Sequence, residues 1–104
     1  MQYVVLRADD SKEVLRRTAP LELKELKALV GGYIEAVGLT PTSNIMCMVN
    51  EEGRLMELPP NPHCPGIVGD VVLGKTASGE FVGLNDGEMK VLGAWVAMPH
   101  GARP

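Results

Sequence analysis

The sequence is poor in the residues that nucleic-acid binding needs. Among its 104 residues only four are aromatic, namely Tyr3, Tyr33, Phe81 and Trp95, and the formal net charge is −3. Proteins that bind nucleic acid gain most of their affinity from basic patches on the phosphates, and single-strand binders stack bases on aromatic rings. Direct binding to nucleic acid is therefore disfavoured.

Long apolar runs are also missing. The run of residues 4–6 is too short for the core of a signal peptide, and no stretch approaches the length that spans a bilayer. We therefore expect a cytoplasmic protein that does not enter membranes. The only two cysteines, Cys47 and Cys64, fit a reducing compartment. Cys47 lies in an apolar run and is expected to pack as a small hydrophobic residue, with a Cys47–Cys64 disulfide as the less favoured alternative.

Metal-binding and catalytic patterns are scarce. His63 and Cys64 are adjacent, so they lack the spacing of two to four residues, repeated twice, that zinc sites use. Neighbouring residues in extended chain point apart, which also disfavours a Cys–His catalytic pair. The acidic pairs at residues 9–10 and 51–52 fall in expected turns, where solvated charge is usual. We predict no catalytic residue, metal or cofactor, and an enzyme is the less favoured interpretation.

One formal motif concerns nucleotide binding. Residues 69–76 match the phosphate-loop pattern, in which Gly and four residues precede Gly74-Lys75-Thr76. The motif works only as a curled loop between a strand and the N-terminus of a helix. Its middle residues here, Val71 to Leu73, favour a strand instead, and Ser78-Gly79 follows as a turn. We interpret the match as coincidental.

What is abundant indicates one globular domain. Hydrophobic residues make up 45% and charged residues 22% of the chain, which is ordinary for a folded domain. We expect a single α+β domain over residues 1–98 and a frayed tail over 99–104. β-rich segments bounded by turn residues predict strands at 2–7, 12–17, 45–49, 54–58, 67–73 and 80–84, with turns at 50–53 and 75–79 and a stiff proline-rich loop at 59–66.

Two helices are expected. Apolar residues spaced by three and four predict one long helix over about 20–37, capped by Thr18 and stopped by Gly38 and Pro41. Asn85 and Glu88 resemble a capping box, which predicts a short C-terminal helix over about 86–96 that buries Met89, Leu92, Trp95 and Val96. The fold class is therefore α+β, an antiparallel sheet of about five or six strands with these two helices.

Several polar and glycine positions are not needed for the expected core. Gly31-Gly32 interrupts the long helix at about 1 kcal/mol for each glycine relative to alanine, which indicates close packing or the approach of a ligand. Asn61 lies between two prolines, so it either presents its amide rigidly or bonds its own loop. The predicted ligand- or partner-binding residues are Gly31, Gly32, Tyr33, Glu35, Asn50, Glu51, Asn61 and Asp70.

Four segments together resemble a known family: residues 29–37 (LVGGYIEAV), 49–53 (VNEEG), 58–61 (LPPN) and 67–72 (IVGDVV). The sequence is similar to a family of small uncharacterised proteins, a domain of unknown function, carried by bacteria and by their phages and plasmids. The resemblance implies a mobile-element setting and assigns no activity.

Three hypotheses follow. The first is a non-enzymatic phage or mobile-element accessory protein that binds a host protein. The second is a protein that binds or sequesters a small ligand, such as a nucleotide. The third is an enzyme of unknown class. An unpaired sheet edge would also allow homo-oligomers to form.

Overall fold

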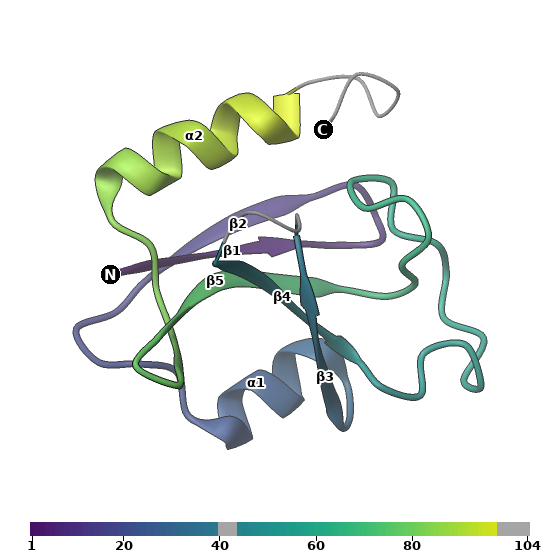
Figure 1. Cartoon of the computed structure of the whole chain (residues 1–104). Helices are drawn as coiled ribbons and strands as arrows, with labels where there is room; N and C mark the ends of the chain where they lie inside the picture. Colours follow the sequence, from purple (N-terminus) through teal and green to yellow (C-terminus); the bar gives the residue numbers. More distant parts are fainter. Residues whose placement is uncertain (40–43, 98–104) are drawn as a thin grey trace.

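The computed structural model describes residues 1–39 and 44–97, and the side chains of these residues up to Gly93. Eight elements follow one another along the chain: β1 (Gln2–Leu6), β2 (Lys12–Arg16), α1 (Leu23–Val30), β3 (Ile34–Gly38), β4 (Ile45–Asn50), β5 (Val71–Ala77), β6 (Glu80–Val82) and α2 (Asp86–Ala97). The sheet lies between the two helices, with α2 on one face and α1 on the other (Figure 1). The α+β class predicted from the sequence is confirmed. No helix within the described residues is long and apolar enough to cross a bilayer.

The sheet is antiparallel throughout. Its strands lie in the order β2-β1-β5-β4-β3, and β6 pairs with the end of β5. The predicted N-terminal hairpin is confirmed as β1–β2, and a two-residue turn, Ser78-Gly79, joins β5 to β6. Both turn residues have positive φ, as hairpin turns that match the sheet twist require.

Both faces of the sheet are buried in the middle. Residues that alternate along β1 and β5 divide between two clusters, because successive side chains point to opposite faces. The cluster on the α2 side contains Val4, Leu6, Cys47, Val49, Cys64, Val71, Leu73, Leu84 and Leu92. The cluster on the α1 side contains Tyr3, Val5, Leu21, Leu26, Val30 and Val72. The expected burial of Trp95 and Val96, and the tail at 99–104, lie outside the described side chains.

The long helix predicted over 20–37 is wrong. Helix α1 has only eight residues and begins after Glu22, without a side-chain cap from Thr18. It ends at Gly31, whose φ of 81° is left-handed, and the backbone N–H groups of Gly31 and Gly32 both donate to Lys27 O at 2.9 and 3.0 Å. Glycine adopts this conformation without the Cβ clash that other residues meet, so the Gly-Gly pair is the end of the helix.

The residues after Gly32 form an edge strand. In β3 the register with β4 pairs Ile34 with Asn50 and Val37 with Cys47. Ile34 and Val37 are among the apolar residues that predict the helix over 20–37, since their spacing of three suits a helix as well. Their branched side chains also suit a pleated sheet, and pairing with β4 decides between the two.

The predicted return strand at 54–58 is also absent. Residues 51–57 form successive turns, in which Met56 N–H donates to Glu52 O (2.9 Å) and Leu58 N–H donates to Gly53 O (3.0 Å). The neighbours of β4 are β3 and β5 instead. The strand predicted at 67–73 begins only at Val71 and continues to Ala77, through residues that were expected to form a turn.

The capping box of α2 is confirmed. Glu88 N–H donates to Asn85 Oδ1 at 2.8 Å, and Asn85 N–H donates to Glu88 Oε1 at 2.9 Å. Lys75 of β5 also donates to Glu88 Oε1, at 2.8 Å, which ties the start of α2 to the sheet. Burial alone would raise the pKa of Glu88, but the hydrogen bonds from Asn85 and Lys75 outweigh it and hold this pKa below its usual 4.5.

A carboxyl group whose pKa is lower in the folded than in the unfolded state stabilises the fold at any pH above its unfolded pKa. This contribution to the free energy of unfolding is lost as the pH falls through the folded-state pKa. The variant Glu88→Gln should therefore lose less stability than wild type between pH 6 and pH 3, as measured by urea unfolding. Asn85→Ala removes the other half of the box and should cost about 1 kcal/mol at pH 7. Equal acid sensitivity of Glu88→Gln and wild type would contradict this assignment.

Candidate functional site: the open edge at β3

The structure brings six of the eight predicted site residues to one corner. Gly31, Gly32 and Tyr33 connect α1 to β3, Glu35 lies on β3, and Asn50 and Glu51 lie at the end of β4. The corner forms because Glu51 N–H donates to Tyr33 O at 2.9 Å and continues the ladder beyond the strands. Asn61 and Asp70 lie away from it, where the loop between β4 and β5 meets β1.

Asn50 is a structural residue of this corner. Its side-chain amide donates to Val30 O (3.1 Å), the last carbonyl of α1, and its Oδ1 accepts from Glu52 N–H (2.8 Å). The Asn50 amide also explains Gly32, because a Cβ at Gly32 would lie 3.1 Å from Asn50 Nδ2. Both residues join α1 to β4 and give the ligand hypothesis no support.

Asn61 is likewise a structural residue, because its side chain bonds backbone groups. Only 3% exposed, it donates to Leu6 O (2.8 Å) and Gly69 O (2.9 Å), and its Oδ1 accepts from His63 N–H (2.9 Å). The structure thus favours the interpretation that Asn61 bonds its own loop, and it adds a bond to β1. Asp70 Oδ1 accepts from Ala8 N–H at 2.9 Å, so this carboxylate joins the end of the loop to the β1–β2 turn.

The remaining predicted residues are accessible. Tyr33 is 62% exposed, and the Lys27 ammonium lies 5.0 Å from its ring centroid. Glu35 and Glu51 are exposed at the margin of a cavity of about 290 Å³, which lies over β3 and β4 on the α2 side of the sheet. Val37 and Val49 line the same cavity, and the 53–55 and 66–68 segments enclose it. We call it the acidic cavity.

On the other face of β3 lies a larger apolar groove of about 770 Å³. Its lining residues come from the segment leading into α1, from α1, and from β3, β4 and β6: Pro20, Leu21, Glu22, Leu23, Leu26, Ile34, Ala36, Met48, Glu80 and Phe81. Leu23 is 60% exposed at its rim. We call this the α1 groove. The sequence does not predict this groove, because the residues of β3 are expected in a helix.

Between the acidic cavity and the α1 groove runs the free edge of β3. Leu39 N–H donates to Ile45 O (3.0 Å) and Glu51 N–H donates to Tyr33 O (2.9 Å). Bonded and non-bonded pairs alternate along an antiparallel ladder, so the odd-numbered residues of β3 bond to β4. The backbone N–H and C=O groups of Ile34, Ala36 and Gly38 therefore point away from β4, where no described strand pairs with them.

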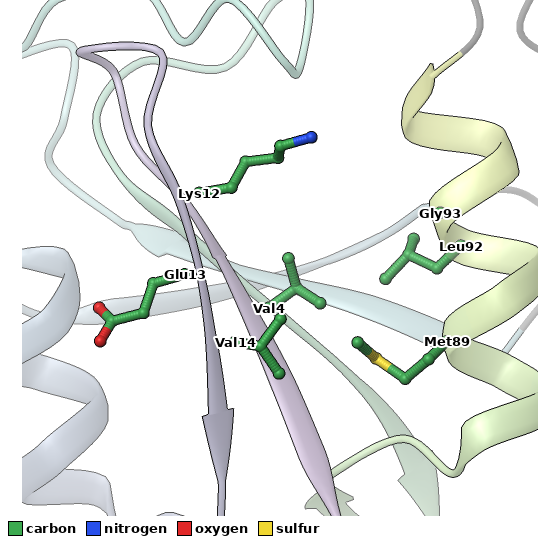
Figure 2. A pocket seen from close by; sticks show the side chains of 7 residues that line it. All are labelled: Val4, Lys12, Glu13, Val14, Met89, Leu92 and Gly93. Carbon is green, nitrogen blue, oxygen red and sulfur yellow. The ribbon is translucent and has the colours of Figure 1, made fainter.

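A third cavity, of about 200 Å³, lies between α2 and the β1–β2 hairpin. Val4, Val14, Met89 and Leu92 point into it, Lys12 extends along its margin, and Glu13 points to the opposite face of the sheet (Figure 2). Gly93 of α2 also lines this cavity, and a Cβ there would meet no atom of the described residues within 4 Å. The sequence carried no separate signal for this cavity, because its apolar residues are indistinguishable from core residues.

The structure also places the residues of the apparent nucleotide motif and of the adjacent His63-Cys64 pair. The apparent phosphate loop at 69–76 is extended from Val71 onward as strand β5, so its amides cannot curl around a phosphate. No group of three or more His, Cys, Asp or Glu residues within the described part of the chain could hold a metal ion. His63 Nε2 lies 3.5 Å from Asp10 Oδ1, which connects the proline-rich loop to the β1–β2 turn.

The two thiols are buried structural groups. Cys47 is 1% and Cys64 4% exposed, both are free thiols, and they belong to one core cluster. Burial, and to a smaller extent the neighbouring Cys64, raises the pKa of Cys47 to about 12. Because the thiolate is the reactive form, Cys47 should not react with iodoacetamide at pH 8 in the folded protein, and should react fully in urea. Rapid labelling of the folded chain, read by mass spectrometry, would contradict this.

These features define a small α+β domain in which no described strand pairs with the outer edge of β3. The sequence profile of the family described as Domain of unknown function (DUF3846) matches residues 1–97, and the chain belongs to this family. No curated protein and no solved structure matches the chain.

Proposed function

We propose that this protein is a non-enzymatic accessory protein of a phage or other mobile element, which acts in the cytoplasm by binding a host protein along the free edge of β3. The observation that carries the proposal is the position of this edge, between the α1 groove and the acidic cavity. An unpaired edge offers backbone donors and acceptors to an extended segment, and pockets beside it select side chains.

A comparison of the two sheet edges supports the choice of β3. On β2, Arg7 N–H donates to Ser11 O and Arg17 N–H donates to Met1 O, so Lys12, Val14 and Arg16 direct their backbone groups outward. Basic side chains on an edge strand discourage further pairing. The outward-facing residues of β3, Ile34, Ala36 and Gly38, carry no charge.

Small-ligand binding is the second candidate function. The observation in its favour is the apolar cavity between α2 and β2, with the Lys12 ammonium at its margin (Figure 2). Its volume of about 200 Å³ is below the roughly 300 Å³ at which typical ligand sites begin. The cavity therefore suits a short apolar anion better than a nucleotide.

Two proline variants test the docking edge. Ala36→Pro removes an outward N–H of β3 and breaks no existing ladder bond, and proline is tolerated on edge strands. Val14→Pro does the same on β2. When the tagged chain is used to capture proteins from host lysate, a partner retained by wild type and Val14→Pro should be lost from Ala36→Pro.

Loss of the partner from both variants, or from neither, would contradict docking at β3. Thermal unfolding of each variant establishes that it is folded. Sedimentation of the purified chain separates partner binding from self-association, because a homo-oligomer that dissociates on Ala36→Pro substitution would mean that β3 pairs with a second copy.

A further inference from the structure

We propose that the segment bound at β3 is an extended strand whose side chains alternate between apolar and basic residues. This inference rests on the proposed function and adds the chemistry of the partner. It follows from the different character of the two pockets that flank β3: the α1 groove is lined mainly by apolar side chains, and the acidic cavity has the carboxylates of Glu35 and Glu51 beside β3.

The alternation follows from strand geometry. Side chains of a strand added to β3 would point in turn to the two faces of the sheet. On one face they would continue the row of Ile34 and Ala36 and reach the α1 groove. On the other they would continue the row of Glu35 and Val37 and reach the acidic cavity.

The α1 groove selects apolar side chains. Leu23, Leu26, Met48 and Phe81 form its walls, and its only charged lining residues are Glu22 and Glu80. Burial of an aliphatic side chain in such a groove is favourable by about 1.5–3 kcal/mol, before the cost of association. An acidic side chain in the same position would lose its hydration and meet like charge.

The acidic cavity selects basic side chains. Within the described residues neither Glu35 nor Glu51 forms an ion pair or a side-chain hydrogen bond. The Glu51 N–H bond to Tyr33 O places this residue beside the start of β3, on the same side of the cavity as Glu35. Val37 and Val49 can cover the aliphatic stem of a lysine or arginine whose charged end meets the two carboxylates.

Arg54 adds a positive charge to the lining of the same cavity. Its guanidinium donates to Gly66 O at 2.8 Å, which holds it at the 66–68 segment. Within the described residues Arg54 forms no ion pair with Glu35 or Glu51, so both carboxylates remain available to a basic side chain of the partner.

A second copy of this chain fits less well than a basic partner. The sequence of β3, Ile34–Gly38, offers Glu35 and no basic residue. Pairing of two β3 strands would therefore place acidic side chains at two acidic cavities, which is unfavourable. Charge complementarity favours a partner of the opposite sign.

Synthetic peptides test the inference directly. The first peptide alternates valine and lysine, and the second alternates valine and glutamate at the same length. Binding of each labelled peptide to the purified chain is measured by fluorescence anisotropy at low and physiological salt. The lysine peptide should bind at least about tenfold more tightly, and raising the salt should reduce this ratio.

The variant Glu35→Gln with Glu51→Gln removes both carboxylates of the cavity and leaves the α1 groove and the ladder intact, so it should reduce the charge preference severalfold, with the remainder due to Glu22 and Glu80. The variant Ala36→Pro should abolish binding of the lysine peptide, and Val14→Pro should not. Equal binding of the two peptides to wild type, lost on Ala36→Pro substitution, would overturn the inference and leave the proposed function standing. Binding that survives Ala36→Pro, or no binding of either peptide, would overturn both.

Discussion

Asn61→Ala should lower the free energy of unfolding by roughly 3–5 kcal/mol. The side chain bonds Leu6 O, Gly69 O and His63 N–H from a position that is 3% exposed. Its removal leaves two carbonyls and one N–H without these partners, and each buried unpaired group costs about 1–3 kcal/mol. A domain of this size has a total stability of about 5–15 kcal/mol, so the variant should be close to the limit of folding.

Urea unfolding at pH 7 measures this loss, and Asn44 supplies the control. Asn44 Nδ2 also donates to a backbone carbonyl, Thr76 O at 3.2 Å, but in an exposed position. Water can replace that bond, so Asn44→Ala should cost less than about 0.5 kcal/mol. A loss below about 1 kcal/mol for Asn61→Ala would mean that Asn61 does not hold the loop to β1. That result would restore it as a candidate for recognition.

Gly74→Ala should lower the free energy of unfolding by about 3 kcal/mol. A Cβ at this position of β5 would lie 2.6 Å from Phe81 Cζ and 2.7 Å from the backbone oxygen of Val82. Phe81 packs against Tyr3 with a centroid distance of 5.5 Å, so its ring cannot move without disturbing the α1-side core. The carbonyl of Val82 belongs to the β5–β6 ladder, and overpacking of this kind costs about 1–3 kcal/mol or more.

Gly93→Ala is the matched control for Gly74→Ala. Among the described residues, no atom beyond its chain neighbours and its own helix backbone lies within 4 Å of the added Cβ, and Gly93 is in a helix, so the substitution should stabilise the protein by about 0.5–1 kcal/mol. Melting temperatures of the two variants should therefore shift in opposite directions. A neutral effect of Gly74→Ala would contradict the close packing of β6 on β5.

The prediction for Gly74 also explains the apparent nucleotide motif. Glycine is required at position 74 because β6 approaches β5 closely there. Lys75 forms an ion pair with Glu88 at the start of α2. Each residue thus has a structural reason that is unrelated to phosphate. The valines and the leucine in the middle of the motif favour the strand that the structure shows from Val71 to Ala77.

Local signals in the sequence predicted several elements correctly. The β1–β2 hairpin and the capping box of α2 each depend on residues a few positions apart. So does the Ser78-Gly79 turn, although the turn predicted at 75–79 is too long, because β5 continues to Ala77. Such signals are sufficient to predict the local structure, because the turn or cap forms from contacts within the segment itself.

The segment after α1 was mispredicted because its decisive contacts are distant in the sequence. Ile34 and Val37 fit the spacing of a helix, and the two glycines were treated as an interruption within it. The left-handed Gly31 ends the helix, and the pairing of β3 with β4 then stabilises the strand. The C-terminal glycine signal that stops helices was present at Gly31 and was assigned instead to Gly38.

The candidate site was predicted in part. Glu35 and Glu51 were singled out from the sequence, and the structure places both at the acidic cavity beside β3. Asn50 and Asn61 were chosen as polar residues outside the core, yet each is buried and bonded to backbone groups. The α1 groove could not be predicted, because it exists only once β3 is a strand and α1 is short.

Amide hydrogen exchange, resolved by residue with NMR, tests the docking edge most directly. The backbone N–H groups of Ile34, Ala36 and Gly38 point away from β4 in the free protein, so they should exchange rapidly. On saturation with the valine–lysine peptide they should become protected by at least about tenfold, as new ladder bonds form. The outward amides of Lys12, Val14 and Arg16 should not change. Protection confined to the β2 edge or to the cavity beside α2, with β3 unchanged, would contradict docking at β3.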